Sequence, residues 1–345
     1  MGEKRNSKRL RLKPDEADII EKYRRIKDEA KAQGLDPKTV HSGWIKSKEA
    51  SLYFQNPKAD PNELDKWAKK LVKSLENHSP TYISIIREKV KDGHLLVVSP
   101  ADVHVGKLCS AFETGKDYNS QIAVKQVLNG VDGLISKSNG FNIDKVLLIG
   151  GNDILHVDNP KNQTTSGTQQ DTSGMWYDNF LMAKQLYVDV IEKLMNIADV
   201  HFVFNPSNHD YMSGFMLAEV IKAHFKDCKN VTFDVSISHR KYFKYHKNLI
   251  GSTHGDGAKQ NDLGSLMSIE AKKDWGLVDF RYFYTHHLHH KVSKDFINVT
   301  VETLRSPSPA DSWHDRNGYV NQPAIEAFIH SKENGQVARL THYFK

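Results

Sequence analysis

The chain has 345 residues, of which 39% are hydrophobic and 26% are charged, a balance typical of a water-soluble globular protein with one large and one smaller domain. No apolar run reaches the roughly 18 residues of a membrane-spanning helix, and the polar N-terminus lacks the apolar segment of a secretory signal. Cys109 and Cys228 show neither metal-type nor disulfide-type spacing. These features exclude a membrane-embedded or disulfide-stapled protein and predict a reducing, cytoplasmic location.

The positive charge is concentrated near the N-terminus. Residues 1–90 contain 21 Lys and Arg against 14 Asp and Glu, whereas residues 91–345 contain 27 against 28. Six basic residues stand against the single acidic Glu3 within residues 1–13: Lys4, Arg5, Lys8, Arg9, Arg11 and Lys13. We expect a basic, flexible arm over residues 1–13. It is either a nucleic-acid-binding arm or a solvated tail without that role.

Residues 14–90 are expected to form a small, basic, helical region. Four apolar residues at helical spacing predict a helix that begins near Asp15 and ends at Gly34: Ile19, Tyr23, Ile26 and Ala30. Asp36-Pro37 is typical of the start of a second helix. This order is shared by DNA-binding helix-turn-helix motifs and by ordinary packed helices, so both readings stay open.

The remainder of this region mixes aromatic and basic side chains. Trp44, Tyr53 and Phe54 interleave with lysines, which suits either base stacking or the interior of a helical subdomain. From Asp60 a capping sequence predicts another helix, whose apolar stripe runs to Leu75. We place the domain boundary near residues 78–92.

From residue 91 to residue 345, short apolar strands alternate with helices. Strands are expected near 95–99, 145–150, 201–205, 248–253 and 281–285, and helices at 121–136 and 175–198. Such short apolar strands are typical of sheets covered by helices. The polar segment 162–174 interrupts the alternation, and we expect it to be a loop beside the functional site.

Polar residues follow each of the five expected strands. They are Asp102 and His104, Asp153, Asn208 to Asp210, His254, and the histidines between His286 and His290. In open α/β sheets, ligands bind beyond the carboxyl ends of the strands. Imidazole and oxygen donors without cysteine favour a catalytic centre of manganese, iron, zinc or cobalt over a structural zinc site.

In order along the chain, these segments resemble the five motifs of the calcineurin-like metallophosphoesterase superfamily. The matching residues are Asp102-Val103-His104, Gly151-Asn152-Asp153, Asn208-His209-Asp210, His254-Gly255-Asp256 and His287-Leu288-His289. The resemblance spans roughly residues 93–345. It implies an α/β fold in which a two-sheet sandwich is flanked by helices. It also implies two divalent metal ions, with manganese favoured and iron, zinc, cobalt or magnesium as alternatives.

The resemblance also assigns roles to individual residues. One metal would be held by Asp102, His104 and His289, the other by Asn208, His254 and His287, and Asp153 would bridge them. His209 would act near the phosphate as a general acid or transition-state stabiliser, and Asp210 would orient it. A metal-bridging hydroxide would attack phosphorus.

Three positions depart from the family pattern. Asn152, Ser207 and His286 each stand where the family usually has glycine. Because His286 precedes His287, the register is open: His286, His287, His289 and His290 form two overlapping candidate pairs. We choose His287 and His289, since His286 then occupies the place of the glycine.

Two further segments point to a subtype. Residues 153–160 are similar to a segment of DNA-repair exonucleases, which places His156 near the substrate phosphate or the metals, with Asp158 and Asn159 beside it. Residues 311–319 resemble bacteriophage-encoded members that also carry a basic helical N-terminus. This second similarity adds Trp313 and His314 as candidate substrate-binding residues.

We therefore expect a metal-dependent phosphodiesterase, a nuclease acting on DNA, in the cytoplasm (the host cytoplasm if the protein is phage-encoded). A phosphatase or phosphodiesterase acting on a small nucleotide or a phosphoprotein is the main alternative. A catalytically silent DNA-binding or scaffold protein is a further one, against which the complete ligand set argues. The sequence leaves a partner protein or a homo-oligomer open.

Overall fold

The computed structural model describes Arg24 and residues 42–46, 51–55, 82–88, 90–319 and 321–344, with the backbone alone for 42–46, 51–55 and 313. Contacts divide the chain into two compact units, Met1–His78 and Ser79–Lys345. Within the described residues, no helix combines the length and the apolar character needed to cross a membrane.

In the first unit the described residues form a hairpin. Strands β1 (Ser42–Lys46) and β2 (Ser51–Gln55) pair antiparallel, with Trp44 opposite Tyr53. The expected helical structure is therefore wrong for this stretch, because β-branched and aromatic residues favour paired strands. Arg24 is helical. The arm 1–13, the remainder of the helix expected from Asp15, and the helices expected at 36–37 and from Asp60 to Leu75 lie outside the described residues.

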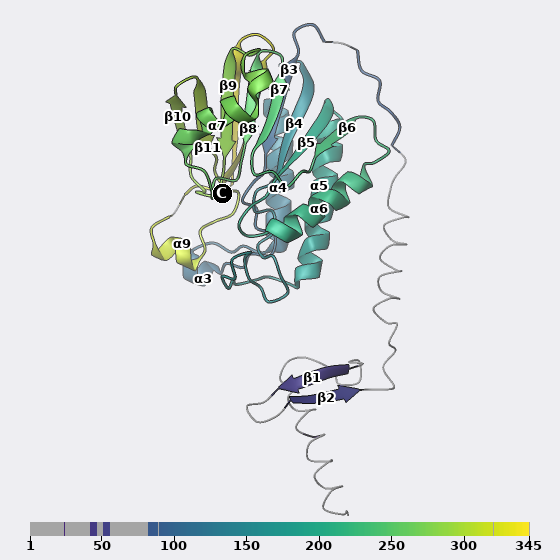
Figure 1. Ribbon diagram of the computed structural model, residues 1–345, viewed down its shortest axis with the longest axis vertical. Coiled ribbons are helices and arrows are strands. Elements are labelled where there is room, and N and C mark those ends of the chain that lie inside the picture. The colour runs from purple at the N-terminus through teal and green to yellow at the C-terminus, as the bar shows by residue number, and fades with distance from the viewer. Residues whose placement is uncertain are drawn as a thin grey trace, which may run out of the picture. The chain divides into compact units, whose positions relative to one another are not determined.

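The second unit contains two sheets, and Figure 1 shows them side by side with helices on their outer faces. The six-stranded sheet has the order β13-β12-β3-β4-β5-β6. Its strands are β3 (His94–Ser99), β4 (Ile143–Gly151), β5 (Asp199–Asn205), β6 (Val231–Asp234), β12 (Ala324–Ser331) and β13 (Gly335–Tyr343). Strands β3 to β6 are parallel to one another, whereas β12 runs antiparallel to both of its neighbours.

The five-stranded sheet has the order β10-β11-β9-β8-β7. Its strands are β7 (Lys241–Tyr245), β8 (Asn248–Ser252), β9 (Phe280–Thr285), β10 (Val292–Phe296) and β11 (Val299–Thr303). The central pairs β8–β9 and β9–β11 are parallel, and the outer pairs are antiparallel.

Helices cover both sheets. The longer ones are α4 (Ser120–Lys137), α5 (Trp176–Met195), α6 (Tyr211–His224) and α7 (Leu263–Glu270), and the short ones are α3 (Ala111–Thr114), η1 (Gln260–Asp262), α8 (Lys272–Trp275) and α9 (Ser312–Arg316). The five expected strands and the two expected helices are confirmed, with ends shifted by a few residues. The two-sheet sandwich flanked by helices is likewise confirmed.

Three clusters of buried apolar residues hold the sheets and helices together. Along β3, Leu96 and Val98 face the helices, whereas Leu95 and Val97 face the other sheet, and β4 and β5 alternate in the same way. A third cluster lies between the five-stranded sheet and α7. Because successive side chains of a strand point to opposite faces, strands apolar on both faces become buried on both.

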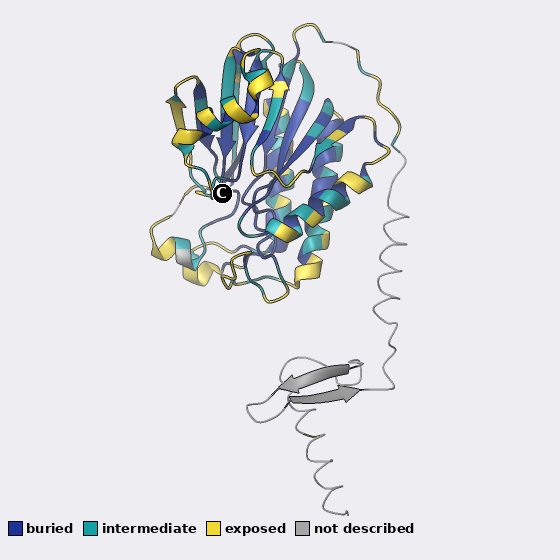
Figure 2. Ribbon diagram, viewed as in Figure 1, coloured by how far each residue is buried: buried dark blue, intermediate teal, exposed yellow. Residues whose placement is uncertain are grey.

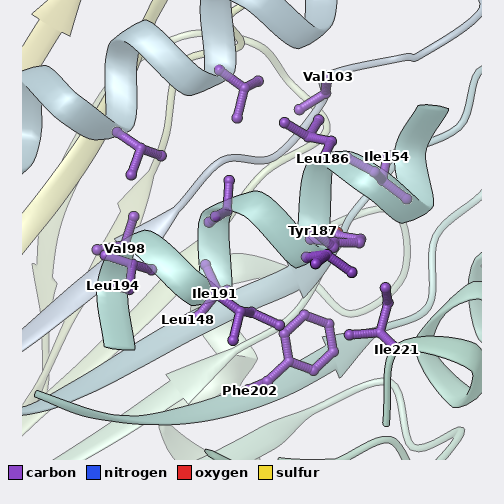
Figure 3. Packing of buried hydrophobic residues seen from close by; sticks show 14 of the residues in the cluster. Val98, Val103, Leu148, Ile154, Leu186, Tyr187, Ile191, Leu194, Phe202 and Ile221 are labelled. Atoms are coloured by element: carbon purple, nitrogen blue, oxygen red, sulfur yellow. The ribbon is translucent and has the colours of Figure 1, made fainter. Parts of the chain in front are cut away.

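The largest cluster joins the six-stranded sheet to α4, α5 and α6. Figure 3 shows Leu186, Ile191 and Leu194 of α5 packed with Leu148 and Phe202 of the sheet. Burial is densest along the strands, and exposed residues gather on the outer faces of the helices (Figure 2). The strands are thereby held rigidly, and their carboxyl ends become a fixed platform for side chains.

Candidate metal centre

The polar residues predicted to form a site follow the carboxyl ends of five strands. Strand β3 leads to Asp102, β4 to Asp153, β5 to Asn208, β8 to His254 and β9 to His287. Three of these strands belong to one sheet and two to the other. The site therefore lies where the ends of the two sheets meet.

The backbone at these turns is unusual. Nine non-glycine residues of the described part of the chain have positive φ, and six of them are at this site: Asp102, His104, Asn152, Asp153, His287 and His289. L-residues adopt this left-handed conformation at a cost, and such strain is concentrated at functional sites. At Gly151 (φ 75°) a Cβ would lie 2.1 Å from the carbonyl oxygen of Asn205, so only glycine fits.

The first cluster consists of Asp102, His104 and His289, whose ligand atoms lie within 4.8 Å of one another. The Nε2 atoms of His104 and His289 are 3.3 Å apart, and Nε2 of His289 is 3.5 Å from Oδ1 of Asp102. Burial, with the nearby charge of His209, holds the pKa of His104 well below its usual value. His104 is therefore neutral, the form in which imidazole binds a metal.

The second cluster consists of Asp153, His254 and His287. Nε2 of His254 lies 3.1 Å from Oδ2 of Asp153 and 2.9 Å from Oδ1 of Asn208, so Asn208 joins this cluster. Burial would lower the pKa of His254, but the Asp153 carboxylate raises it to about 9. Burial would likewise raise the pKa of Asp153, but the charges of His254 and His209 lower it below its usual value.

Both clusters suit divalent cations. The carboxylate of Asp102 is fully buried, and its described contacts are the backbone N–H of His287, at 3.2 and 3.4 Å, and the imidazole of His289. A buried carboxylate without a strong counter-charge is costly. Carboxylate, amide oxygen and imidazole together are the donors that manganese, iron, zinc or cobalt accept. The residues present therefore fit a two-metal centre.

The two clusters are tied to each other through the backbone. The N–H groups of Asp102 and His104 donate to the carbonyl oxygens of Asn152 and Asp153, at 2.8 and 3.0 Å. The chain segment that carries two ligands of the first cluster is thus aligned directly on the turn that carries Asp153. Asp153, a member of the second cluster, is thereby held next to the segment of the first cluster.

His209 and His156 lie against the first cluster. The rings of His209 and His156 stack with centroids 5.3 Å apart, and the ring of His209 is 4.6 Å from that of His104. Nδ1 of His209 lies 2.9 Å from the carbonyl oxygen of His156. Because a carbonyl can only accept, Nδ1 of His209 carries a proton and its Nε2 is left for proton exchange.

Asp210 does not orient His209 as expected. Its side chain is fully buried, and it accepts hydrogen bonds from Ser207 Oγ at 2.6 Å and from the backbone N–H of Leu155 at 2.8 Å. Burial, together with the charge of Asp153, raises the pKa of Asp210 to about 7. The expected contact is wrong because the chain turns into α6 directly after Asp210 and carries its carboxylate beneath the Asp153 turn.

The three departures from the family pattern each have a structural reason. Asn152 has φ 53°, a conformation that asparagine tolerates better than most residues. Ser207 Oγ accepts the backbone N–H of Asp153 at 2.7 Å, so it supports the ligand turn. His286 is buried with Nε2 3.2 Å from Ser99 Oγ and belongs to neither cluster. His287 and His289, in contrast, each lie in one of the two clusters.

A cavity of about 420 Å³ opens above the clusters. Its floor contains His104, Asp153, His156, Asn208, His209, His287 and His289. One wall is the expected polar loop, with Thr164, Ser166, Thr168, Gln169, Gln170 and Asp171, and another is the segment with Asp311, Ser312 and His314. The loop 162–174 thus lies beside the site, as the sequence indicated.

The remaining substrate-binding candidates separate into two groups. His156 and His314 line the cavity, whereas Asp158 and Asn159 do not. Asp158 accepts the N–H groups of Met212 and Ser213 and therefore stabilises the start of α6, and Asn159 closes a local turn onto Lys161. Trp313 lies in α9, where only the backbone is described.

Lys107 is the main contributor that sequence reasoning missed. It is buried against the second wall, where it contacts Asp311. A lysine three residues after a predicted ligand looks like a surface residue in the sequence. Its burial results from contacts with two loops that are distant in the chain, and such contacts cannot be read from the sequence around Lys107.

No protein-family profile matches the sequence, and no curated protein matches it either. Among solved structures, an archaeal phosphodiesterase matches with 13% identity and a TM-score of 0.32, covering 73% of this chain and 99% of its own. Vps29 of Entamoeba histolytica complexed with zinc matches with 13% identity and a TM-score of 0.29, with coverages of 73% and 99%. A predicted phosphoesterase of Streptococcus pneumoniae matches with 11% identity and a TM-score of 0.29, covering 74% and 100%. At these values we base the function on the geometry of the site.

Proposed function

We propose that this protein is a divalent-metal-dependent phosphodiesterase that hydrolyses nucleic-acid phosphodiester bonds, with DNA as the favoured substrate. The observation that carries the proposal is the pair of ligand clusters at one end of the sandwich, with His209 beside the first cluster and an open cavity. Paired divalent cations in such sites serve phosphoryl transfer.

The chain's own residues would divide the work. Asp102, His104 and His289 would hold one cation, and Asn208, His254 and His287 the other, with Asp153 shared between them. When bound, the cations supply Lewis-acid polarisation of the phosphoryl oxygens and neutralise charge that develops in the transition state.

His209 would donate a proton to the leaving oxygen of the substrate. Its Nδ1–H is anchored on the carbonyl oxygen of His156, so the ring is held with Nε2 as the exchangeable position. The stacked ring of His156 limits rotation of the His209 ring. Together they would place a proton donor at the edge of the cavity floor.

The preference for nucleic acid is supported by the basic residues 1–13 and by the similarity of residues 153–160 to DNA-repair exonucleases. Lysine and arginine contacts to phosphates provide affinity that does not depend on sequence. A specific observation favours a second candidate, a phosphodiesterase of small nucleotides. The cavity volume of about 420 Å³ lies in the range of small-molecule sites.

The direct test is hydrolysis by purified protein with added manganese. A phosphomonoester, a small chromogenic phosphodiester, and labelled single- and double-stranded DNA would be compared. We expect cleavage of the diester and of DNA, complete loss in chelator, and better recovery with manganese than with magnesium, because imidazole ligands favour manganese. Full activity in chelator would contradict the metal assignment.

Deletion of residues 1–13 separates the two candidates. If the arm contacts DNA, affinity for DNA falls and its salt dependence flattens by about 0.7–0.9 in log–log slope for each lost phosphate contact. Hydrolysis of the small diester, which needs only the cavity, should hardly change. No effect on either substrate at low salt would favour the small-nucleotide candidate.

A further inference from the structure

Lys107 is a buried cation beside the candidate site. Only 1% of its surface is exposed, and its Nζ donates to the carbonyl oxygen of Pro309 at 2.8 Å and lies 3.1 Å from Oδ2 of Asp311. Burying an ammonium group is costly, and an apolar side chain could fill the same space more cheaply. The contacts that Lys107 makes therefore need an explanation beyond packing.

The backbone around Lys107 is paired with the first cavity wall. Leu108 N–H donates to the carbonyl oxygen of Asp171 at 3.2 Å, and Ser173 N–H donates to that of Gly106 at 2.7 Å. Lys107 itself forms a β-bridge with Thr172. The end of the polar loop 162–174 is thus attached to the segment that begins with the ligands of the first cluster.

The side chain of Lys107 organises the second wall. While Oδ2 of Asp311 faces Lys107, its Oδ1 accepts hydrogen bonds from the backbone N–H and Nδ1 of His314, at 2.9 and 2.6 Å. The ring of His314 lies almost parallel to that of His289, at 11° with centroids 5.2 Å apart. Lys107 thus holds Asp311, Asp311 holds His314, and His314 lies against His289 of the first cluster.

The ligand segment and both walls are therefore joined at a single residue. The backbone N–H of Lys107 also donates to the carbonyl oxygen of His104 at 2.9 Å, which connects it to a ligand residue. Movement of either wall relative to the clusters would require breaking bonds of Lys107 or its neighbours. Lys107 does not itself line the cavity, and neither does any other described lysine or arginine.

The walls have the chemistry of an uncharged, hydrogen-bonding ligand. They present hydroxyl groups from threonine and serine, amides from Gln169 and Gln170, and the carboxylates of Asp171 and Asp311. Without lysine or arginine among the described lining residues, the walls would not attract a second phosphate. A sugar or a base, with its donors and acceptors, is complementary to them.

We propose that Lys107 is a positioning residue that holds both walls over the metal ligands and thereby sets the affinity for the nucleoside part of a phosphodiester substrate. This rests on the proposed function, since it assumes that the phosphate is bound at the ligand clusters. Lys107 does not touch the reacting phosphate. It acts by keeping Asp311, His314 and the loop end at Asp171 in place.

The test compares two chromogenic diesters in the variant Lys107→Met, which shortens the unbranched side chain by one atom and removes its charge and hydrogen bonds. One substrate is the p-nitrophenyl ester of thymidine 5′-monophosphate, and the other is bis(p-nitrophenyl) phosphate, which has no nucleoside. We expect KM for the thymidine ester to rise by about 10-fold, the scale of a lost buried polar contact. We expect kcat and KM for the second substrate to change less than about 3-fold.

The matched control is Lys241→Met. Lys241 is similarly buried and also bonds a carboxylate and a carbonyl, those of Asp234 and Ser236. Neither of these partners lines the cavity, whereas Asp311, the partner of Lys107, does. Both variants should lower the unfolding temperature, and only Lys107→Met should raise KM selectively. Manganese affinity, measured by calorimetry, should stay within about 2-fold of wild type in both.

The proposal would be overturned if Lys107→Met and Lys241→Met had equal KM values for the thymidine ester. A loss of manganese affinity in Lys107→Met would also overturn it. If Lys107→Met does not fold, Asp311→Asn weakens the same contact from the partly exposed side and should raise KM for the thymidine ester alone. If the wild-type protein hydrolyses neither diester, the proposed function fails. Hydrogen exchange then decides the positioning role: faster exchange at residues 169–173 and 309–316 in Lys107→Met, but not in Lys241→Met, supports it, and unchanged exchange refutes it.

Discussion

Two groups of buried acidic residues lie in the same sandwich and are neutralised in different ways. Glu302 of β11 and Glu326 of β12 are buried and share Arg339, and Arg305 pairs with Glu326; both arginines are half-buried. Arg305 Nη1 and Arg339 Nη2 lie 2.7 and 2.8 Å from Oε1 of Glu326, and Arg339 also pairs with Glu302. We refer to these four residues as the arginine–glutamate network.

Asp102 and Asp153 are buried just as deeply, but histidines take the place of arginines. Their ion-pair partners among the described residues are His289 and His254. A guanidinium keeps its proton at any ordinary pH, whereas an imidazole can give it up and offer a lone pair to a metal. The network is therefore permanently neutralised by the chain itself, while the ligand clusters can exchange protons for cations.

The largest effect is expected from Asp153→Asn, which removes the charge shared by the two clusters. Activity should fall by at least about 10³-fold, because several kcal/mol of charge stabilisation are lost together with the metals. Metal content, measured by elemental analysis, should fall for both sites at once. In chelator the unfolding temperature should change little, since His254 can lose its proton when its carboxylate partner is gone. Unchanged metal content would contradict the shared role of Asp153.

A smaller loss is expected from His209→Ala, which leaves both clusters intact. Turnover should fall by about 10²–10⁴-fold if His209 transfers a proton. The loss should shrink for substrates with a good leaving group, such as p-nitrophenolate, because such a group needs less protonation. A series of aryl diesters of rising leaving-group pKa measures this dependence. Loss of bound metal would instead identify His209 as a ligand.

Asp210→Asn should reduce turnover by only about 10–100-fold, in the manner of residues that support metal ligands from outside. Asp210 accepts hydrogen bonds from Ser207 and Leu155, and Ser207 in turn holds the Asp153 turn. The variant Ser207→Ala tests this route. If Asp210 acts through Ser207, the double variant should lose no more activity than Asp210→Asn alone, whereas additive losses would show separate roles.

The smallest effect on catalysis is expected from Glu326→Gln in the arginine–glutamate network. Arg305 would lose its carboxylate partner and Arg339 would keep only Glu302, so the free energy of unfolding should fall by about 2–4 kcal/mol. Activity of the folded protein should be unchanged. Chemical denaturation in chelator measures the loss, and Glu270→Gln, whose partner Arg240 forms a more exposed pair, should cost less than about 1 kcal/mol. Equal losses in Glu326→Gln and Asp153→Asn would remove the distinction between the two groups.

Much of the site could be predicted from the sequence because its information is local. An apolar run followed by a turn and a polar residue identifies a strand end within about ten residues. Five such segments predicted that Asp102, Asp153, Asn208, His254 and His287 follow strand ends at one site. The helices over 121–136 and 175–198 were predictable for the same reason, since their apolar faces repeat at short range. The hairpin at 42–55 was not, because a short mixture of aromatic and basic residues suits a strand as well as a helix.

The tertiary structure alone decided how side chains far apart in the chain meet. The partner of His209 is a carbonyl 53 residues away, and Lys107 reaches a carbonyl 202 residues away. Asp158 was expected to bind substrate, but in the structure it accepts a hydrogen bond from the backbone N–H of Ser213 and stabilises the start of α6. Periodicity and motif spacing report only which face of an element is apolar and where the element ends. Contacts between loops depend on how whole sheets pack, and that packing is a property of the complete chain.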